Sequence, residues 1–511
     1  MNQKLAEDLR IAKDKAREHI IKSGDLPVMT FRRLKKLKWL SEITKGWYIL
    51  KTPDADDGES TLWYANFWAF LKYFLTENYK TDYCLNPLSS IFLKTESSAI
   101  PAQVIVILKN GGGRTLELPF KTSILFYRDE KNFPVDIEEF KGLNIVELPK
   151  AITMVPESFY ANFENEAELA LLMIKTPGEI TRHLLDNEQP VKADIISGAY
   201  EFLGKKDFAT QIKKDMEILA YTIRPKNPFK REAPILSHTR IKSPAVARIE
   251  LLWKKFKDEL KKNIIPPNLA NEDLDGMLEK VENIYVHDAY NSLSIEGYAV
   301  TEELIQKVSD GSFDAEANED DKKQEAAMAA KGYFLAFQEV KEFIKENYGK
   351  KIDQIEFNTQ VQNWYRQLFT PKVQSGLAKP SLLTSYRNKP VFIRGSRHTP
   401  VNYSFIGDVM EKYLQILDEE KTPWVKALLG HFILVYIHPF PDGNGRTARF
   451  LMNAVLVLSG YSWTVVRLKE KKNYFKALEA ASVEGDIDGF AKFIKQELEV
   501  SSRWSLESKE S

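Results

Sequence analysis

The sequence predicts a multidomain protein with a mixed α/β N-terminal part and a mostly helical C-terminal part. The chain has 511 residues, enough for two to four domains at roughly 100–200 residues each. Hydrophobic residues make up 43% of the chain and aromatic residues 12%, which supplies packed cores and excludes wholesale disorder. Strand-like apolar runs lie in the first 150 residues, whereas helical patterns dominate after a Pro- and Lys-rich segment at 223–244.

The charge balance and the cysteine content narrow the class of protein. Lys plus Arg and Asp plus Glu each number 72, and this zero net charge argues against a protein that coats nucleic acid over its whole surface. The one cysteine, Cys84, excludes a disulfide framework and a thiolate metal cluster. The N-terminus lacks the apolar core of a secretory signal, and no uncharged apolar run of about 18 residues is present. We therefore expect a cytoplasmic protein with no membrane partner.

Residues 1–52 have the outline of a winged-helix-like module. A helical pattern runs from Asn2 to Lys22, and Thr30 can cap a short basic helix that follows it. Residues 43–50 then read as a turn and a strand. Between Thr30 and Lys51 there are seven basic residues and one acidic residue. Such a helix can lie in a major groove of DNA and neutralise phosphates, and the candidate residues are Arg32, Arg33 and Lys36. An ordinary solvated amphipathic helix explains the same pattern.

Residues 53–222 are predicted to form a mixed α/β domain. Apolar runs at 104–108 and 116–120 flank a glycine run, which lacks the Gly-Lys-Ser/Thr ending of a phosphate loop and so predicts a hairpin turn. Residues 157–204 read as helical. With its basic helix and Gly-Trp-Tyr wing, the N-terminal arrangement is similar to winged-helix antitoxin and abortive-infection regulators.

A linker at 223–244 separates this part from a helical region at 245–348, which leads into a core domain at 349–500. The acidic stretch from Ser309 to Asp321 interrupts two helical patterns and predicts an exposed loop.

In the segment 422–450, a combination of residue types occurs that structural roles alone do not explain. Thr422 is a good N-cap, and Pro423 fits the first position of a helix whose residues 424–437 are nearly all apolar. Pro439 disfavours helical backbone at His438 and so ends this helix. A titratable imidazole is thereby fixed at the mouth of a rigid element, where a general base is useful.

The residues that follow predict a phosphate site. Asp442 precedes a Gly-Asn-Gly run, whose backbone N–H groups can form a concave nest at the start of a new helix. Arg446 and Arg449 are three residues apart, so both can lie near one face of that helix. The Asp442 carboxylate can hold a hard cation such as Mg²⁺. Base, metal ligand, nest and two arginines together indicate nucleotide-phosphate transfer.

The segment resembles the Fic family, whose motif is His-x-Phe-x-(Asp/Glu)-Gly-Asn-Gly-Arg-x-x-Arg. Every fixed position matches, and the resemblance covers about residues 245–500. It implies an all-α Fic fold with a β-hairpin flap and protein adenylyltransferase activity. His438 would deprotonate a target hydroxyl that attacks the α-phosphate of ATP, Asp442 would hold Mg²⁺, and Phe440 would anchor the loop. The nucleotide-binding residues would include Asp442, Gly443, Asn444, Gly445, Arg446 and Arg449. Gly445 stands where the phosphotransferase branch carries Lys.

Two upstream segments match further family features. Residues 385–400 resemble the flap, a hairpin to whose edge a target protein can add a strand. Its residues Val391, Phe392, Ile393 and Arg394 would lie at the nucleotide; an ordinary surface hairpin is the less favoured alternative. Ser292, Glu296 and Gly297 match the inhibitory pattern (Ser/Thr)-x-x-x-Glu-(Gly/Asn). The resemblance implies that Glu296 pairs with Arg449 and occupies the group that should receive the γ-phosphate.

Several alternatives stay open at the level of sequence. Tyr474 resembles the position that lines the nucleotide base, but Ser482 replaces an adenine-contacting Asn of some relatives, and Tyr474 fits a helix core equally well. Transfer of another nucleotide and removal of AMP are enzymatic alternatives. A DNA-binding regulator or toxin–antitoxin switch, in which the Fic domain senses nucleotide, is an alternative of another class. The target protein, the trigger that displaces Glu296 and the oligomeric state, a homodimer included, are not specified.

Overall fold

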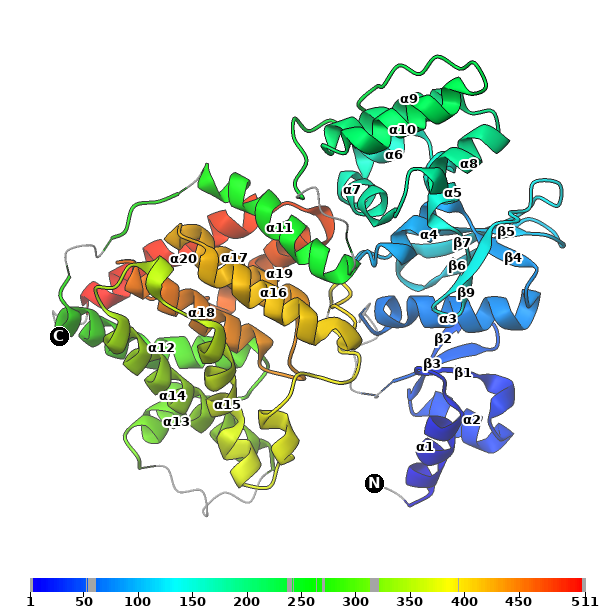
Figure 1. Ribbon diagram of the computed structural model, residues 1–511. Coiled ribbons are helices and arrows are strands. Elements are labelled where there is room, and N and C mark those ends of the chain that lie inside the picture. The colour runs from blue at the N-terminus through cyan, green and yellow to red at the C-terminus, as the bar shows by residue number, and fades with distance from the viewer. Residues whose placement is uncertain are drawn as a thin grey trace. The chain divides into compact units, whose positions relative to one another are not determined.

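The computed structural model describes residues 3–51, 53, 61–236, 241, 243–262, 264–268, 272–312, 321–393 and 395–507. Contacts between Cα atoms divide the chain into two compact units (Figure 1). The N-terminal unit comprises Met1–Arg248 together with Phe392–Thr399, and the C-terminal unit comprises Ile249–Val391 together with Pro400–Ser511.

The N-terminal unit begins with two helices and a three-stranded antiparallel sheet. Helices α1 (Gln3–Lys15) and α2 (Val28–Lys36) pack on strands in the order β1 (Ile20–Lys22), β3 (Trp47–Leu50) and β2 (Leu40–Thr44). The prediction of one helix up to Lys22 is wrong, because Ile20–Lys22 pairs with β3. The predicted turn and strand at 43–50 are present as the β2–β3 hairpin, which turns at Gly46 with φ +83°.

A six-stranded mixed sheet follows in the same unit. Its strand order is β6 (Arg114–Leu118), β7 (Thr122–Arg128), β5 (Gln103–Leu108), β4 (Tyr83–Leu85), β9 (Leu143–Val146) and β8 (Ile137–Phe140). The predicted strands are present as β5 and β6, but the hairpin predicted across the glycine run is wrong. Strand β7 lies between them, antiparallel to β6 and parallel to β5, so the glycine run is a connection between strands that are not neighbours.

Helices cover both sides of this sheet. Aromatic side chains of α3 (Thr61–Tyr79) share a core with the sheet residues Val104, Val106 and Leu108. Helix α3 lies on one side of the sheet in Figure 1, and a group of shorter helices lies on the other. These are α4 (Pro87–Lys94), α5 (Leu148–Met154), α6 (Glu157–Asn162), α7 (Glu164–Met173), α8 (Gly178–Asp186), α9 (Pro190–Phe202) and α10 (Lys206–Glu217). The helical prediction for 157–204 is confirmed as α6 to α9.

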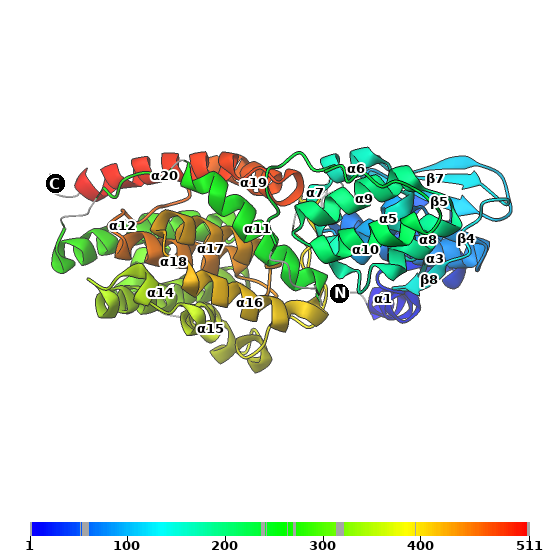
Figure 2. The same cartoon turned by 45° about the horizontal axis from the view of Figure 1, so that its top comes forward.

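The described part of the C-terminal unit is helical. Helix α17 (Pro423–Ile437) is buried on nearly every side and packs along α18 (Asn444–Leu458), as its continuous apolar run predicts. Figure 2 shows the long helices of this unit running side by side. The others are α11 (Pro244–Lys261), α12 (Leu274–Ile295), α13 (Glu302–Ser309), α14 (Asp321–Asn347), α15 (Asn358–Gln374), α16 (Ile406–Glu419), α19 (Lys471–Glu479) and α20 (Asp488–Glu507).

The β-hairpin flap predicted at 385–400 is wrong for the residues described there. These residues form no ladder with one another, and their one bridge joins His398 to Ala99 within the N-terminal unit. Pro390 and Pro400 lack the N–H groups that a hairpin ladder requires. The carbonyls of Lys389 and Val401 are also taken, because both accept hydrogen bonds from the Arg387 guanidinium.

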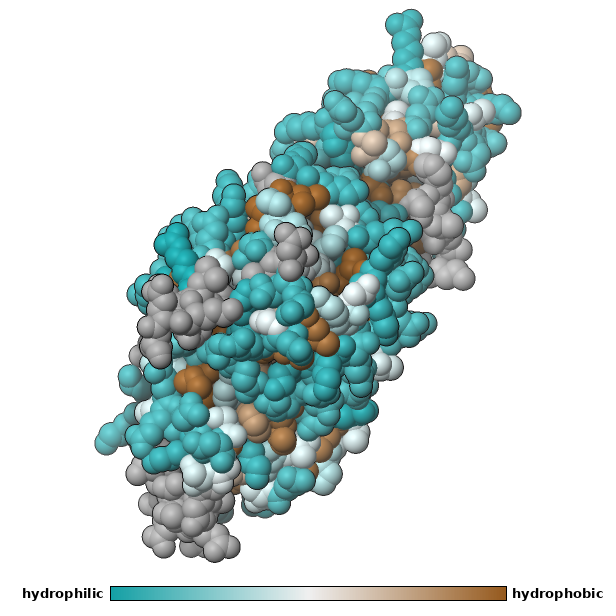
Figure 3. All heavy atoms as spheres, turned by 90° about the vertical axis from the view of Figure 1, so that its left-hand side faces the viewer, coloured by the Kyte–Doolittle hydropathy of each residue, from teal (hydrophilic) through white to brown (hydrophobic). Residues whose placement is uncertain are grey.

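Polar side chains are frequent in the long described helices and on the face shown in Figure 3. Across the described ranges, every helix is too short or too polar to pass through a lipid bilayer. The face shown in Figure 3 is mainly hydrophilic, with small and separate apolar spots.

Candidate active site

His438 lies at the C-terminal end of α17 in a left-handed backbone conformation, with φ 54° and ψ 58°. This conformation ends the helix, as Pro439 predicts, and it is costly for a residue with a Cβ atom. The ring Nδ1 lies 3.2 Å from the carbonyl of Val435, so we assign the proton to Nδ1 and the free lone pair to Nε2. Burial lowers the pKa of His438 to about 4, helped by the Arg387 charge, while Glu296 and Asp442 act in the opposite direction. The ring is therefore neutral at pH 7 and can accept a proton.

The loop after His438 is held by Asn444. Its side-chain oxygen accepts the Phe440 N–H at 2.9 Å, and its side-chain nitrogen donates to the Phe440 carbonyl at 2.9 Å. Phe440 is buried and stacks on Tyr365 with ring centroids 3.8 Å apart, which confirms its role as a core anchor. The Asn444 side chain is 2% exposed and braces the loop through both of its polar atoms. Its contact with nucleotide stays a prediction.

Two glycines shape the start of α18. Gly443 has φ +80°, and a Cβ atom there would lie 2.6 Å from the Phe369 ring. A Cβ atom on Gly445 would lie 2.5 Å from the Glu296 carboxylate and 3.1 Å from the Arg449 guanidinium. The first amides of α18 have no carbonyl partner within the helix and lie at the positive end of its dipole. The start of α18 thus has the unpaired amides and the small residues that the predicted phosphate site requires, and phosphate binding there stays a prediction.

Arg446 is fully buried between two aromatic rings, with its guanidinium carbon 5.0 Å from the Tyr298 centroid and 5.2 Å from the Phe369 centroid. Its Nη2 lies 3.1 Å from Asp442 Oδ2, but neither Nε nor Nη2 makes a well-aligned hydrogen bond. Burial opposes the charge of Arg446, yet Asp442 and Tyr298 keep its pKa above the ordinary value. A buried cation with spare donors is suited to bind an anion.

The predicted metal ligand Asp442 is engaged on both of its carboxylate oxygens. Oδ1 accepts the Gly443 N–H at 2.6 Å, and Oδ2 accepts the Tyr298 hydroxyl at 3.2 Å. Burial alone would raise the pKa of Asp442, but the Arg446 charge and these hydrogen bonds lower it overall. The side chain is 46% exposed, so one ionised carboxylate is accessible beside the phosphate site. This donor fits Mg²⁺, which is often held by one or two carboxylates together with substrate phosphates.

The predicted pairing between the inhibitory residues and Arg449 is present. Arg449 Nη2 donates to Glu296 Oε1 at 2.7 Å, and Arg449 Nε donates to the Ser292 hydroxyl at 2.8 Å. Arg449 is 2% exposed, whereas the Glu296 side chain is 25% exposed. Burial by itself would lower the pKa of Arg449, but the Glu296 carboxylate raises it overall. Arg449 is thereby occupied in this structure.

Gly297 ends α12 with a left-handed residue at φ +93°. The Gly297 N–H donates to the Ser294 carbonyl and the Tyr298 N–H donates to the Leu293 carbonyl, both at 3.1 Å. This pair of bonds is a Schellman motif, which favours glycine at this position. Gly297 therefore acts through the backbone: it lets the chain leave the helix directly after Glu296 and carry Tyr298 to Asp442.

A stripe of three polar residues on α12 faces the buried arginine. Asp288, Ser292 and Glu296 are spaced by four residues and so share one face of the helix. The Tyr333 hydroxyl donates to Asp288 Oδ2 at 2.7 Å. Burial raises the pKa of Asp288 to about 6. Asp288 belongs to this site, but no sequence motif indicated it.

Tyr474 lies in the core of the C-terminal unit. It is 1% exposed, its ring packs near Phe490 and Phe493, and its hydroxyl lies 2.7 Å from His431 Nε2. Burial raises its pKa to about 12. The structure supports the helix-core alternative rather than a base-lining role for Tyr474.

The predicted flap residues are divided between the two units. Val391 belongs to the C-terminal unit, whereas Phe392 and Ile393 belong to the N-terminal unit, where the Phe392 ring lies 6.3 Å from that of His19. Arg394 lies outside the described residues. A nucleotide-binding role for all four stays a prediction. Tyr298 and Arg387, by contrast, contact the site, and sequence reasoning missed both roles.

The three predicted DNA-binding residues have different environments on α2. Arg32 and Lys36 are exposed. Arg33 donates to both oxygens of the buried Asp8, at 2.6 and 2.8 Å, and Asp8 also accepts the Thr30 hydroxyl. This ion pair ties α2 to α1 and occupies Arg33, whose DNA-binding role stays a prediction. Thr30 is likewise buried inside α2 and does not cap it.

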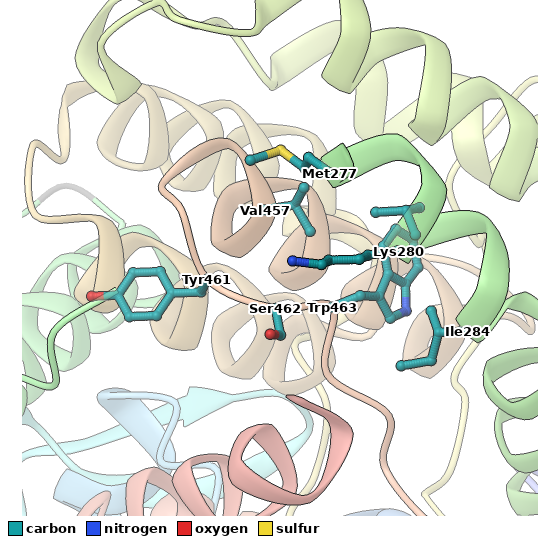
Figure 4. A pocket seen from close by; sticks show the side chains of 8 residues that line it. Met277, Lys280, Ile284, Val457, Tyr461, Ser462 and Trp463 are labelled. Atoms are coloured by element: carbon teal, nitrogen blue, oxygen red, sulfur yellow. The ribbon is translucent and has the colours of Figure 1, made fainter. Parts of the chain in front are cut away.

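Two other features of the described residues do not add a site. The cavity in Figure 4, between α12 and α18, is lined by Lys280, Tyr461 and Trp463 among others, and its volume of about 10 Å³ holds roughly one water molecule. Asp136, Glu147 and His183 place ligand atoms within 4.8 Å of one another. Lys150 and Arg182 already pair with these carboxylates.

The sequence profile described as the Fic/DOC family matches residues 357–456, which contain His438, Asp442, Arg446 and Arg449. The protein adenylyltransferase Fic of Nematostella vectensis is 28% identical over 233 residues, which cover 43% of this chain and 48% of that protein. The protein adenylyltransferase Fic of Drosophila mojavensis is 36% identical over 113 residues, 21% of this chain and 22% of that protein. The protein adenylyltransferase fic-1 of Caenorhabditis elegans is 31% identical over 130 residues, 25% of each chain. The chain thus spans less than half of the length of these relatives.

Two solved structures have chains similar to this one. A Fic domain containing signaling protein from Bacteroides thetaiotaomicron is 19% identical, with 50% of this chain and 93% of that chain covered and a TM-score of 0.38. Fic-1 (residues 134–508) of C. elegans is 18% identical, with 71% and 92% covered and a TM-score of 0.37. Residues 357–456 of this chain thus match the Fic/DOC family and carry its motif.

Proposed function

We propose that the protein is an adenylyltransferase that moves AMP from ATP to a hydroxyl side chain of a target protein. The observation that carries the proposal is a neutral His438, with its Nε2 lone pair free, at the loop that ends in the buried cations Arg446 and Arg449. The names of the relatives support the choice of adenylyl transfer. In the proposed reaction the acceptor hydroxyl attacks directly, with His438 as its base.

In this reaction His438 acts as the general base. The target oxygen forms a bond to the α-phosphorus while the bond from that phosphorus to the bridging oxygen breaks and pyrophosphate leaves. His438 Nε2 takes the proton of the attacking hydroxyl, and its Nδ1–H keeps the ring oriented against Val435. A lowered pKa keeps the base unprotonated at neutral pH, although it also limits its basic strength.

The start of α18 binds the phosphates. The first amides of the helix lie within one turn of Arg446, whose Nε and Nη2 are spare donors, and the absence of side chains at Gly443 and Gly445 lets the backbone approach the anion. Arg449 becomes available to the terminal phosphate only after Glu296 leaves it. These positioned donors supply charge stabilisation without large rearrangement during the reaction.

Asp442 is the residue that would hold Mg²⁺ in this site. Bound there, the ion would neutralise the negative charge that develops on the phosphate oxygens. Tyr298 has to release Asp442 Oδ2 for a cation to use that oxygen, so the inhibitory end of α12 covers the metal carboxylate as well as Arg449.

We propose that residues 292–298, the inhibitory segment, hold the enzyme inactive. Glu296 occupies Arg449, repels a triphosphate and is backed by Ser292, while Tyr298 occupies Asp442 and the face of Arg446. A hydrogen bond to a charged group contributes about 1.5–3 kcal/mol, so loss of the Glu296 contact should raise activity about tenfold or more.

The test compares the full chain with its Glu296→Gly variant in ATP labelled on the α-phosphate, with a cell lysate as a source of targets. Label is expected on protein with the variant, little with wild type, and none with a Glu296→Gly, His438→Ala double variant. ATP labelled on the γ-phosphate should give no label. A γ-derived label would replace adenylyl by phosphoryl transfer, and loss of all His438-dependent label would refute the proposal. Glu303→Gln, which removes an exposed ion pair with Lys307, is the matched control.

Two enzymatic alternatives use the same residues. Transfer of UMP or GMP differs in the added mass, and removal of AMP runs the phosphodiester chemistry toward a free hydroxyl. Mass spectrometry of a target before and after incubation separates the three outcomes, because each changes the target mass by a different amount or sign.

A second candidate function is DNA binding by the N-terminal module, in which α2 acts as the recognition helix of a winged-helix-like fold. The exposed Arg32 and Lys36 are one helical turn apart on α2, so both can reach the same DNA backbone. A salt-dependent mobility shift of duplex DNA that disappears in an Arg32→Ala, Lys36→Ala variant would support this function. No shift at low salt would refute it.

A further inference from the structure

We infer that Arg387 is a positioning residue for the general base, an assignment that rests on the proposed adenylyl transfer. Arg387 lies in the segment before the loop 390–400 and is 5% exposed. Its backbone N–H donates to the Pro439 carbonyl at 2.9 Å, and its Nε donates to the His438 carbonyl at 2.7 Å. One Nη2 contact, at 3.5 Å, reaches the Ile437 carbonyl. Arg387 therefore satisfies three consecutive carbonyls around the catalytic histidine.

A count of carbonyls shows how the loop is fixed. The end of a helix leaves its last carbonyls without intrahelical donors, and buried carbonyls require partners. Leu434 accepts the His438 N–H and Val435 accepts the His438 ring. The Phe440 carbonyl accepts the Asn444 side chain. Of the four carbonyls between Val435 and Phe440, those of residues 437–439 accept hydrogen bonds from Arg387.

The positive charge of Arg387 lies at the C-terminal end of the buried helix α17. Among the described residues, no carboxylate pairs with it, and burial lowers the pKa of its guanidinium to about 10. A cation at the C-terminus of a buried helix is stabilised by the negative end of the helix dipole. The positive charge of Arg387 is thus stabilised by the dipoles of backbone carbonyls. Only a planar group with several donors can bind these carbonyls in several directions at once. Its contacts hold His438 in the left-handed conformation that aims the ring.

The same guanidinium joins the base of the loop 390–400 to the histidine. Its Nη1 donates to the Lys389 carbonyl at 3.0 Å, and Nη2 donates to the Val401 carbonyl. Both ends of that loop are therefore tied to the residue that fixes His438. Arg387 contacts neither Asp442 nor the inhibitory segment through any bond of the described residues, so its loss should affect the base more than nucleotide binding.

The experiment substitutes Arg387 in the Glu296→Gly background and measures kcat and KM for ATP. Arg387→Lys keeps a positive charge but cannot bind carbonyls in several directions, and Arg387→Ala leaves a space for added methylguanidine. We expect kcat to fall about 100-fold in both variants, with KM changed less than about threefold, since a small misplacement of a reacting group can cost this much. Methylguanidine should restore part of kcat in Arg387→Ala alone. The control is Arg366→Lys, an exposed arginine that also donates to a backbone carbonyl, Leu383 O.

A second readout does not depend on activity. In histidine-labelled protein, the ring signals of His438, assigned with His438→Ala, should move in Arg387→Lys while those of the buried His431 stay in place. Unchanged kcat and unchanged His438 signals would overturn the assignment, as would a rise in KM at constant kcat. If the Glu296→Gly parent itself transfers no label, the proposed function fails, and the ring signals still decide whether Arg387 positions His438. Urea unfolding of each variant identifies any general loss of stability.

Discussion

The Glu296 carboxylate lies 2.7 Å from Nη2 of Arg449, across 153 residues of sequence. Arg449 is buried and Glu296 is its carboxylate partner at the end of α12, so the pair closes the terminal part of the phosphate site from inside the protein. In the proposed function, this pair makes inhibition a property of the chain itself. Substitutions of the neighbouring residues Gly297 and Tyr298 test the same proposed inhibition.

Tyr298→Phe should activate the enzyme in part. The substitution removes the hydroxyl that donates to Asp442 but keeps the ring on Arg446. Since a hydrogen bond to a charged group contributes about 1.5–3 kcal/mol and solvent screens part of this at a half-exposed carboxylate, we expect a rise of about threefold to tenfold in labelling at limiting Mg²⁺. The measurement is the initial rate of α-label incorporation across Mg²⁺ concentrations. Equal Mg²⁺ dependence in wild type and variant would contradict the role of Tyr298.

Gly297→Ala should weaken the end of α12. The backbone at this position has φ +93°, which a residue with a Cβ atom adopts at a cost of about 1 kcal/mol or more. We expect a lower free energy of unfolding in urea together with a higher rate of AMP transfer, because the last turn holds Glu296. Gly407→Ala is the matched control, since a Cβ atom there meets nothing within 4 Å and the residue lies in α16. Equal behaviour of the two variants would argue against a special backbone role.

The pH dependence of the released enzyme should reflect the lowered pKa of His438. With a folded-state pKa of about 4, the base stays unprotonated from pH 8 to well below 6. We therefore expect kcat of the Glu296→Gly variant, at saturating ATP and Mg²⁺, to be nearly constant between pH 8 and pH 6. Removal of Glu296 lowers this pKa further, since the carboxylate raises it. Half-maximal activity near pH 6.5 would show that His438 titrates as an exposed histidine.

Asn444→Ala should destabilise the active-site loop. The substitution leaves the buried N–H and carbonyl of Phe440 without their partners, and each unsatisfied group costs about 1–3 kcal/mol. We expect a loss of stability of about 2–4 kcal/mol in urea and a loss of His438-dependent labelling. Asn473→Ala, at an exposed position where the side chain bonds to Glu470, should change neither property. A stable but inactive Asn444→Ala variant would instead indicate direct contact with the nucleotide.

Arg33 and Arg32 should separate stability from DNA binding. Arg33→Ala removes the partner of the buried Asp8 and should lower the stability of the N-terminal module. The hydrogen bond from Arg33 lowers the pKa of Asp8, so this stabilisation is present above the ordinary pKa of 3.8 and is lost as the pH falls through the folded-state value. Arg32→Ala should leave stability unchanged and weaken any duplex binding. Circular dichroism in urea and a mobility shift measure the two effects, and a destabilised Arg32 variant would contradict this division.

Much of the site was predictable from the sequence because its residues are close together in the chain. The end of α17 at Pro439, the turn at Gly443 and the two arginines of α18 follow from local rules of helix ending and helix spacing. The Glu296 contact was predictable only through resemblance to a family. Nothing in the spacing alone pairs residues that are 153 positions apart.

The rest depended on tertiary contacts that leave little trace in one sequence. The carbonyls that Arg387 satisfies become visible only when the loop is folded, and its position in an expected hairpin pointed to a different role. Strand β7 separates β5 from β6, which no turn signal in the glycine run reveals. The sequence fits Tyr474 equally well to a nucleotide contact and to a helix core, and its burial in the structure favours the core. Ile20 fits a helical pattern but pairs as a strand, because the sheet offers it a buried position.

The three residues that follow α12, 296–298, carry both contacts of the inhibitory segment with Arg449 and Asp442. Glu296 caps α12 and Tyr298 lies beyond Gly297, while Ser292 and Asp288 lie within the helix, one and two turns before Glu296, and keep their own bonds to Arg449 and Tyr333. Local unfolding of residues 296–298 would therefore release Arg449 from Glu296 and Asp442 from Tyr298, while the rest of α12 stays in place. Ends of helices open at far lower cost than whole elements. In the proposed adenylyltransferase, a partner would therefore need to capture only a few residues of loosened backbone to relieve the inhibition.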